Sequence, residues 1–325
     1  MLAALGVAAG LAVVEGVARL AGHAPHAPVD FPLRVEPPGW LADDAEAGWT
    51  LAPGSFHARF ADGTGWTATH PARGRRLVPG SGGPHRVVLL GDSVPYGWGV
   101  DDDQTVAAHL ARALPHTTVE LRAVPGHSLA QTWVVLRQLL AREPGAVVIL
   151  GYASWLDERT VWARHWQRSL AAFTREGPLG AVAVPWVRDP ERPAPTPGGR
   201  LRYAAWPGEG WSAAVAWAAQ VGEARELRGL QPERVAVAVL RAMGEEAARA
   251  GTGLVVVGLA GDDATRARLA SVASTGLAVL QADVDLRAAP WSLLPRDPHL
   301  SPAGHARLAE VVLGHLGTAN DHPAP

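Results

Sequence analysis

Residues 87–100 read VVLLGDSVPYGWGV, and the rest of the chain is best understood outward from this stretch. Four apolar residues at 87–90 run directly into Gly91, Asp92 and Ser93, a pattern that predicts a buried parallel strand ending in a tight turn. In an open α/β sheet, ligands bind beyond the carboxyl ends of the strands. The hydroxyl of Ser93 is therefore expected where chemistry takes place.

After this strand the chain alternates between strand and helix patterns, as a parallel sheet requires. Strands are expected at 118–124, 146–150, 253–259 and 277–282, and helices at 103–114, 129–142, 155–173, 232–250, 263–274 and from 302 onward. The pattern predicts an α/β fold, a three-layer α/β/α, flavodoxin-like sandwich. Its five-stranded parallel sheet would have the order 2-1-3-4-5, in which the strand order reverses beside the first strand.

Residues 1–22 form an apolar stretch about as long as the roughly 20 residues that cross a bilayer. Glu15 and Arg19 interrupt it, and their spacing of four allows them to pair on one face of a helix. We expect a membrane anchor or signal-like helix, which would place the main domain in the periplasm or outside the cell. A cleaved signal peptide and a soluble core helix are the alternatives.

The remaining segments differ in composition. Residues 23–84 are rich in Pro, Gly and His and indicate a linker followed by an irregular, β-rich lead-in, whereas 85–318 hold the main domain and 319–325 a flexible tail. An insertion at about 175–230 carries many Pro and Trp residues and interrupts the alternation. It is too apolar for disorder, and we expect a lid or side wall over the site, with packing against the core as the alternative.

Composition bounds the function. With 325 residues, of which 48% are hydrophobic, the chain can bury one large core or a core with a small appendage. The formal net charge is −2 and the basic residues, all arginine, form no stripe, so we expect no nucleic-acid partner. Because there is no cysteine, disulfides, thiolate nucleophiles and cysteine metal sites are excluded.

Two further motifs carry little weight. The glycines of 91–99 lack both the G-x-G-x-x-G spacing and a Walker lysine, which argues against a nucleotide-binding loop. The aspartates at 101–103 stand before a predicted helix and indicate solvated charge at its N-terminus rather than a cation site. We expect no metal ion and no cofactor.

Ester hydrolysis needs a nucleophile, a base, a group that orients the base, and donors for the oxyanion. Ser93 is the candidate nucleophile, His299 the candidate base and Asp297 the residue that orients it. Two residues apart in an extended loop, Asp297 and His299 leave the backbone on the same side at roughly 6 to 7 Å. A carboxylate at that spacing can fix the tautomer of the imidazole.

These segments resemble the sequence blocks of the SGNH (GDSL) hydrolases, in which the serine of Gly-Asp-Ser accepts the acyl group. Gly91-Asp92-Ser93 matches the first block, and Asp297-Pro298-His299 followed by Leu300-Ser301-Pro302-Ala303-Gly304-His305 resembles the last. Gly48-Trp49-Thr50-Leu51-Ala52-Pro53 is similar to a lead-in found in some membrane-anchored bacterial members. The resemblance covers 47–160 and 277–317 but not the insertion.

The resemblance also implies an oxyanion hole. Two of its donors would be the backbone N–H groups of Ser93 and Gly126, where a glycine after the second strand lets the backbone approach a ligand. In the family the third donor is an Asn side chain after the third strand, but this position is held here by Ala153 or Ser154. The Ser154 hydroxyl can donate in its place and the alanine cannot; losing one donor typically costs about 10²–10³ in rate.

A second departure concerns the spacing of the last block, since the commonest family pattern places the aspartate three residues before the histidine and here the interval is two. With this resemblance we expect a serine esterase acting on a small acyl ester, such as an O-acyl group on cell-envelope carbohydrate. The alternatives are a carbohydrate-binding relative without activity, whose insertion tryptophans stack on sugar rings, and an O-acyltransferase that uses the same three residues.

Overall fold

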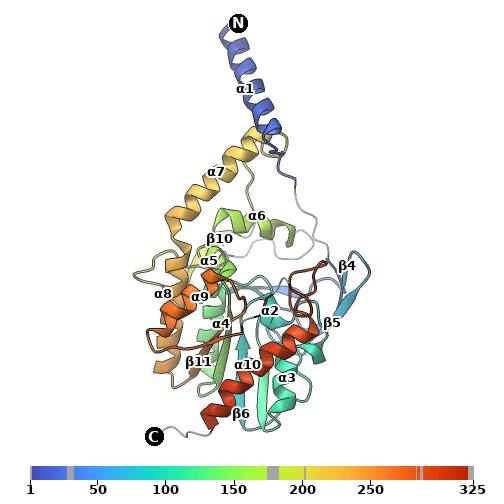
Figure 1. Ribbon diagram of the computed structural model, residues 1–325, viewed down its shortest axis with the longest axis vertical. Coiled ribbons are helices and arrows are strands. Elements are labelled where there is room, and N and C mark those ends of the chain that lie inside the picture. Colours follow the sequence, from blue (N-terminus) through green and yellow to red (C-terminus); the bar gives the residue numbers. More distant parts are fainter. Residues whose placement is uncertain are drawn as a thin grey trace.

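The computed structural model describes residues 2–27, 33–173, 183–200, 203–282, 284–285 and 288–320. At its centre lies a parallel sheet of five strands (Figure 1), which are β6 (His85–Leu90), β7 (Thr117–Leu121), β8 (Val147–Tyr152), β11 (Gly253–Gly258) and β12 (Ala278–Gln281). Their order is β12-β11-β8-β6-β7, so the predicted order 2-1-3-4-5 is confirmed. All neighbouring pairs in this sheet are parallel.

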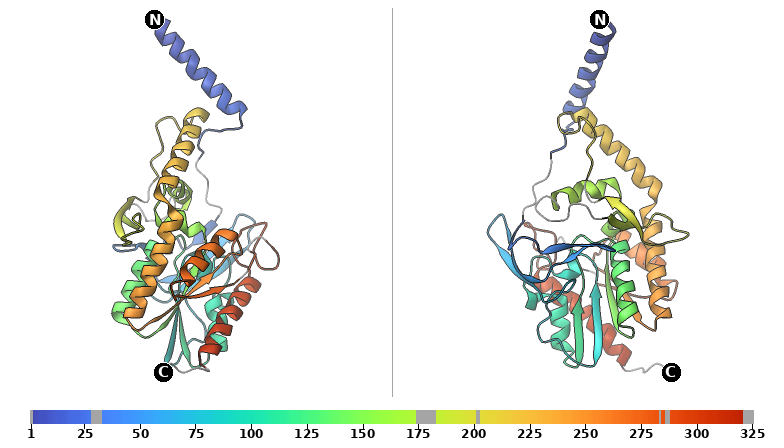
Figure 2. Two further views of the ribbon diagram at one scale, coloured as in Figure 1. Left: turned by 60° about the vertical axis from the view of Figure 1, so that its left-hand side comes forward. Right: turned by 180° about the vertical axis from the view of Figure 1, so that it is seen from behind.

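Helices cover both faces of this sheet (Figures 1 and 2), which confirms the three-layer α/β/α sandwich. One face packs against α3 (Val106–Ala113) and α10 (Pro302–Asn320), and the other against α4 (Leu129–Arg142), α8 (Pro232–Arg249) and α9 (Asp263–Ala273). The strand residues divide by their period of two, since Val87 and Leu89 join the first cluster while Val88 and Leu90 join the second. A strand buried on both sides must be apolar throughout, which is why 87–90 carries no polar residue.

The helix boundaries follow local signals in the sequence. Ser128 accepts a hydrogen bond from the backbone N–H of Gln131, and the Gln131 side chain accepts one from the backbone N–H of Ser128. This capping box starts α4 at the predicted residue. In contrast, the single helix expected at 155–173 is divided into α5 (Trp155–Thr160) and α6 (Arg164–Phe173). The break lies at buried Trp162, whose φ of 54° no α-helix accommodates.

The lead-in is β-rich, as expected, and more regular than its sequence indicates. A three-stranded antiparallel sheet contains β1 (Leu33–Glu36), β4 (Gly54–Phe60) and β5 (Gly65–His70), and a separate pair is formed by β2 (Leu41–Asp44) and β3 (Gly48–Leu51). The strands are too short for a sustained sequence period. Their buried residues nevertheless pack into the same core cluster as the main sheet.

Arg76, at the end of the lead-in, fixes the loop that follows β6 and α2 (Ser93–Tyr96). Its guanidinium is fully buried, pairs with Asp102 at 2.8 Å, and donates to the carbonyl oxygens of Tyr96, Gly97 and Val100. Losing one partner of a buried pair costs about 3–5 kcal/mol. The lead-in is therefore an integral support of this loop.

The expectation that the aspartates at 101–103 are simply solvated is wrong for two of them. Asp101 accepts a hydrogen bond from the backbone N–H of Thr67 at 2.7 Å, and Asp102 is the partner of Arg76. Spacing along the chain could not show this, because both partners come from the lead-in.

The insertion contributes β9 (Ala183–Trp186), β10 (Thr196–Arg200) and α7 (Ala213–Leu230). β9 and β10 pair antiparallel, and α7 leads directly into α8. Residues 174–182 and 201–202 of the predicted insertion, like 28–32 of the linker and 321–325 of the tail, lie outside the described residues.

The N-terminal helix α1 (Leu2–Leu20) extends away from the body of the molecule (Figures 1 and 2). The expected pairing of Glu15 with Arg19 is present at 2.7 Å. Glu15 also accepts hydrogen bonds from the backbone N–H of Ala214, the Ser212 hydroxyl and the backbone N–H of Ala213 at the start of α7. These hydrogen bonds, that of Ala214 most of all, lower the pKa of Glu15 to about 2. Among the described residues no helix combines the length and the apolar character that crossing a membrane requires, so the span expected at 1–22 is not confirmed.

Candidate active site

Ser93 stands at the first position of α2, directly after β6. The turn before it depends on Gly91, whose φ is +142° and where a Cβ would lie only 2.8 Å from Pro95. The carboxylate of Asp92 then accepts a hydrogen bond from the backbone N–H of Val94 at 3.1 Å and caps this short helix. The local sequence thus holds the hydroxyl of Ser93 beyond the carboxyl end of the strand.

The structure brings the three predicted catalytic residues into one hydrogen-bonded chain. His299 Nε2 lies 2.7 Å from Ser93 Oγ, although the two residues are 206 positions apart in sequence. Asp297 Oδ1 lies 2.5 Å from His299 Nδ1 and also accepts from the backbone N–H of His299 at 2.8 Å. A carboxylate at Nδ1 favours the tautomer with its proton there, so that Nε2 is free to accept the proton of Ser93.

Trp98 supports this arrangement, and the sequence analysis did not identify it. Its indole N–H donates to Asp297 Oδ2 at 3.2 Å, and its ring stacks on His299 with centroids 5.4 Å apart. Burial acts to raise the pKa of Asp297, but the hydrogen bonds from His299 and Trp98 outweigh it and hold that pKa below its ordinary value. Asp297 therefore stays ionised, as its predicted role beside His299 requires.

Gly126 follows β7 and adopts a φ of +81°. Trp49 of β3 packs against it, and the Trp49 indole donates to the carbonyl oxygen of Pro125 at 3.0 Å. On the other side, His127 Nε2 lies 2.9 Å from the carbonyl oxygen of Trp49, and burial lowers the pKa of His127 to about 4. The lead-in tryptophan thus positions the loop that carries a predicted oxyanion donor.

Gly126→Ala is expected to lower kcat about 100-fold, because the positive φ disfavours a side chain and a Cβ would press on Trp49 at 3.3 Å. Gly145→Ala is the matched control, since Gly145 also has a positive φ of 88° but open space around its Cα. Both variants should melt at lower temperature than the wild type. Equal kcat in the two variants would remove Gly126 from the oxyanion hole.

The third predicted donor, Ser154, lies in the same cavity as Ser93. Its hydroxyl donates to Asp262 at 3.1 Å, and its backbone N–H donates to Thr265 at 3.0 Å. Ala153, the other residue at this position, is fully buried and has no side-chain donor. The role of Ser154 at the oxyanion remains a prediction.

The cavity in front of Ser93 has a volume of about 960 Å³. Its lining residues come from segments that follow β6, β8, β11 and β12 and from the loop that holds His299: Ser93, Val94, Ser154, Trp155, Glu158, Arg159, Ala260, Gly261, Asp262, Asp285, Pro298 and His299. The described parts of the insertion, 183–200 and 203–230, contribute none of them, so the expected lid is not confirmed. Instead, Trp217 of the insertion stacks on His23 beside α1.

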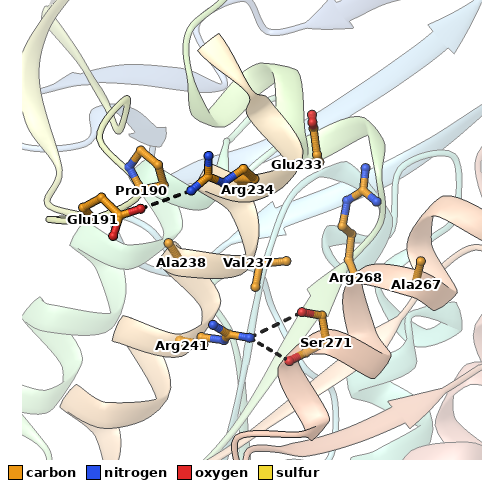
Figure 3. Close-up of a pocket in the computed structure, with 10 residues that line it drawn as sticks. All are labelled: Pro190, Glu191, Glu233, Arg234, Val237, Ala238, Arg241, Ala267, Arg268 and Ser271. Atoms are coloured by element: carbon orange, nitrogen blue, oxygen red, sulfur yellow. Dashed lines mark hydrogen bonds and ion pairs between the residues drawn. The ribbon is translucent and has the colours of Figure 1, made fainter. Parts of the chain in front are cut away.

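A second, smaller pocket of about 380 Å³ lies between α8 and α9 (Figure 3). Arg234 pairs there with Glu191 at 3.1 Å, and Arg241 donates to the carbonyl oxygen of Ser271 at 3.0 Å. Neither a histidine nor a serine–base pair lines it. Within the described part of the chain, no cluster of three His, Asp or Glu side chains is arranged to hold a metal ion.

In comparisons with known proteins, no family model and no curated protein matches this chain. Three similar solved structures are TesA (15% identity, TM-score 0.43, covering 72% of this chain and 99% of that one), a GDSL-like lipase from Bacteroides thetaiotaomicron (11%, 0.39, 72% and 88%) and the psychrotrophic esterase EstA from Pseudoalteromonas sp. (10%, 0.40, 74% and 100%). Because these identities and TM-scores are low, we take the function from the geometry of the site.

Proposed function

We propose that the chain is a serine hydrolase of the SGNH type that cleaves an ester bond. The observation that carries this proposal is the hydrogen-bonded chain from Ser93 Oγ through His299 to Asp297, at 2.7 and 2.5 Å. Such a chain is the arrangement that activates a serine hydroxyl as a nucleophile. It stands beside a cavity large enough for a substrate.

The reaction would proceed in two halves. Ser93 Oγ bonds to the ester carbonyl carbon while its proton passes to His299 Nε2, and the backbone N–H groups of Ser93 and Gly126 stabilise the oxyanion. His299 then returns the proton to the departing alcohol, which leaves an acyl group on Ser93. Water attacks this acyl group with His299 again as base, and Ser93 regains its proton as the acid leaves.

The cavity supports a small acyl ester on a polar alcohol, such as an O-acyl group on carbohydrate. Its polar lining residues include the acidic side chains Glu158, Asp262 and Asp285. Carboxylates accept hydrogen bonds from hydroxyl groups such as those of a sugar.

The test uses the full chain with p-nitrophenyl acetate and a fluorophosphonate probe. We expect turnover, and we expect mass spectrometry to find the probe on the peptide that contains Ser93. A protein that binds glycans saturably but neither reacts with the probe nor hydrolyses the ester would be a carbohydrate-binding relative. Acetyl groups recovered on an added glycan rather than as acetate would identify an O-acyltransferase.

We also propose that α1 attaches the chain to a membrane, with the main domain in the periplasm or outside the cell. Val7, Leu11 and Val13 of α1 are each more than 60% exposed, an unusual density of apolar surface. In liposome flotation, we expect the wild type to rise with the vesicles and Leu11→Glu to do so several-fold less. Ala224→Glu on α7 should match the wild type, and flotation of Leu11→Glu equal to it would contradict this attachment.

A further inference from the structure

The end of β8 leaves one donor of the oxyanion hole unassigned. Ala153 has no donor, and the Ser154 hydroxyl is directed to Asp262. Asp262 is itself held in place, because it caps α9 through the backbone N–H of Thr265 at 2.8 Å and accepts from the Thr265 hydroxyl at 2.7 Å. Turning the Ser154 hydroxyl toward Ser93 would break its hydrogen bond to Asp262.

Arg159 offers a positive group at the same wall of the cavity. It belongs to α5, which begins directly after the end of β8, and it is the one arginine among the described residues that line the cavity with Ser93. Its guanidinium lies over the ring of Trp166 at 4.1 Å, and only 15% of the side chain is exposed. Stacking on a ring in a mostly buried position restricts the orientation of this group.

Asp92 connects Arg159 to the nucleophile turn. Arg159 Nη1 donates to Asp92 Oδ2 at 2.9 Å, while Asp92 Oδ1 accepts from the backbone N–H of Val94, the residue after Ser93. The carboxylate is almost completely buried and also accepts from the indole N–H of Trp155 at 2.9 Å. One carboxylate therefore fixes the guanidinium relative to the backbone on both sides of Ser93.

We propose that Arg159 is a further catalytic residue, whose guanidinium donates a charge-assisted hydrogen bond to the oxyanion formed when Ser93 attacks. This inference rests on the proposed function. A guanidinium carries five N–H donors in a rigid plane, so the bond to Asp92 leaves donors for a second acceptor. Charge that is already oriented in an enclosed site stabilises a developing oxyanion strongly, because little reorganisation is needed during the reaction.

Two substitutions separate charge from hydrogen bonding. Arg159→Gln keeps an N–H donor that can reach toward Asp92 but removes the positive charge, whereas Arg159→Lys keeps the charge. We expect Arg159→Gln to lower kcat about 10²–10³-fold with little change in KM, and Arg159→Lys to recover at least tenfold of that loss. Equal kcat in Arg159→Gln and the wild type, or in Arg159→Gln and Arg159→Lys, would overturn the proposal.

A third variant tests whether Arg159 acts only by holding Asp92. Trp155→Phe removes another donor to Asp92 and leaves every charge in place, so its kcat should fall less than tenfold. A loss as large as that of Arg159→Gln would assign both residues a positioning role and overturn the catalytic one. Arg188→Met is the control for folding, because Arg188 also lies over a tryptophan, Trp186 at 3.7 Å, but outside the cavity.

Failure of the proposed function can be recognised separately. It would appear as a wild type that neither hydrolyses esters nor reacts with a fluorophosphonate. Binding of methylphosphonate, a tetrahedral anion, then decides the role of Arg159 by calorimetry. We expect binding at least tenfold weaker in Arg159→Gln than in the wild type, and equal affinities would contradict the inference.

Discussion

Ser93→Ala is expected to lower kcat for p-nitrophenyl acetate by about 10⁴ to 10⁶-fold, because it removes the hydroxyl that would form the acyl bond. The hydroxyl of Ser93 is 2.7 Å from His299 Nε2, and this is the contact through which its proton would leave. A methyl group at the same position removes the nucleophile and keeps the turn. The fold should therefore be unchanged, and the measurement is the initial rate together with the melting temperature.

Ser274→Ala provides the matched control for this experiment. Ser274 follows α9, is exposed, and donates its hydroxyl hydrogen bond to the carbonyl oxygen of Ser271. Its removal should leave both the rate and the reaction with a fluorophosphonate at wild-type levels. If Ser93→Ala retained more than a tenth of the wild-type kcat, the proposed function would lose its nucleophile.

The sheet order and the meeting of Ser93 with His299 could be predicted because they depend on local patterns combined with topology. An apolar run bounded by glycine, the Ser128 cap and the start of the last helix at Pro302 are each visible in a few residues. Once the strands are parallel and ordered, their carboxyl ends share one edge. Segments 206 residues apart then converge without any further information.

The groups around these residues could not be predicted in the same way. Trp98 reaches Asp297 because its loop is fixed by Arg76, and Arg159 of α5 reaches Asp92 in the turn before α2. Each of these contacts depends on the direction of a long side chain, which tertiary packing decides. The sequence gives the positions of Trp98 and Arg159 along the chain but not the directions in which their polar atoms point.

The N-terminal helix illustrates the same limit. Its composition favours a membrane segment, in which the charge of Glu15 would be costly at membrane depth. In the structure Glu15 is the acceptor for the first N–H groups of α7, a favourable position for a carboxylate at a helix N-terminus. Nothing near residue 15 in the sequence indicates a partner almost 200 residues away.

Asp297→Asn is expected to lower kcat about 10⁴-fold while the fold is retained. Asp297 accepts from His299 N and Nδ1 through one oxygen and from Trp98 through the other. An amide cannot accept at both positions, and an NH₂ group facing Nδ1 favours the tautomer whose proton is on Nε2. That tautomer cannot take the proton of Ser93, so the nucleophile remains a neutral hydroxyl.

Trp98→Phe tests how much the orientation of the Asp297 carboxylate contributes when its charge is kept. This variant removes the hydrogen bond to Oδ2 and keeps a smaller aromatic ring against His299, so we expect kcat to fall about tenfold. Steady-state rates at several pH values provide the measurement. Because Asp297 has a lowered pKa, the wild-type rate should show no loss from its protonation until the pH falls below the usual carboxyl range. A small effect of Asp297→Asn, comparable to that of Trp98→Phe, would mean that His299 is oriented by its backbone and by ring stacking, and that the carboxylate does not set its tautomer.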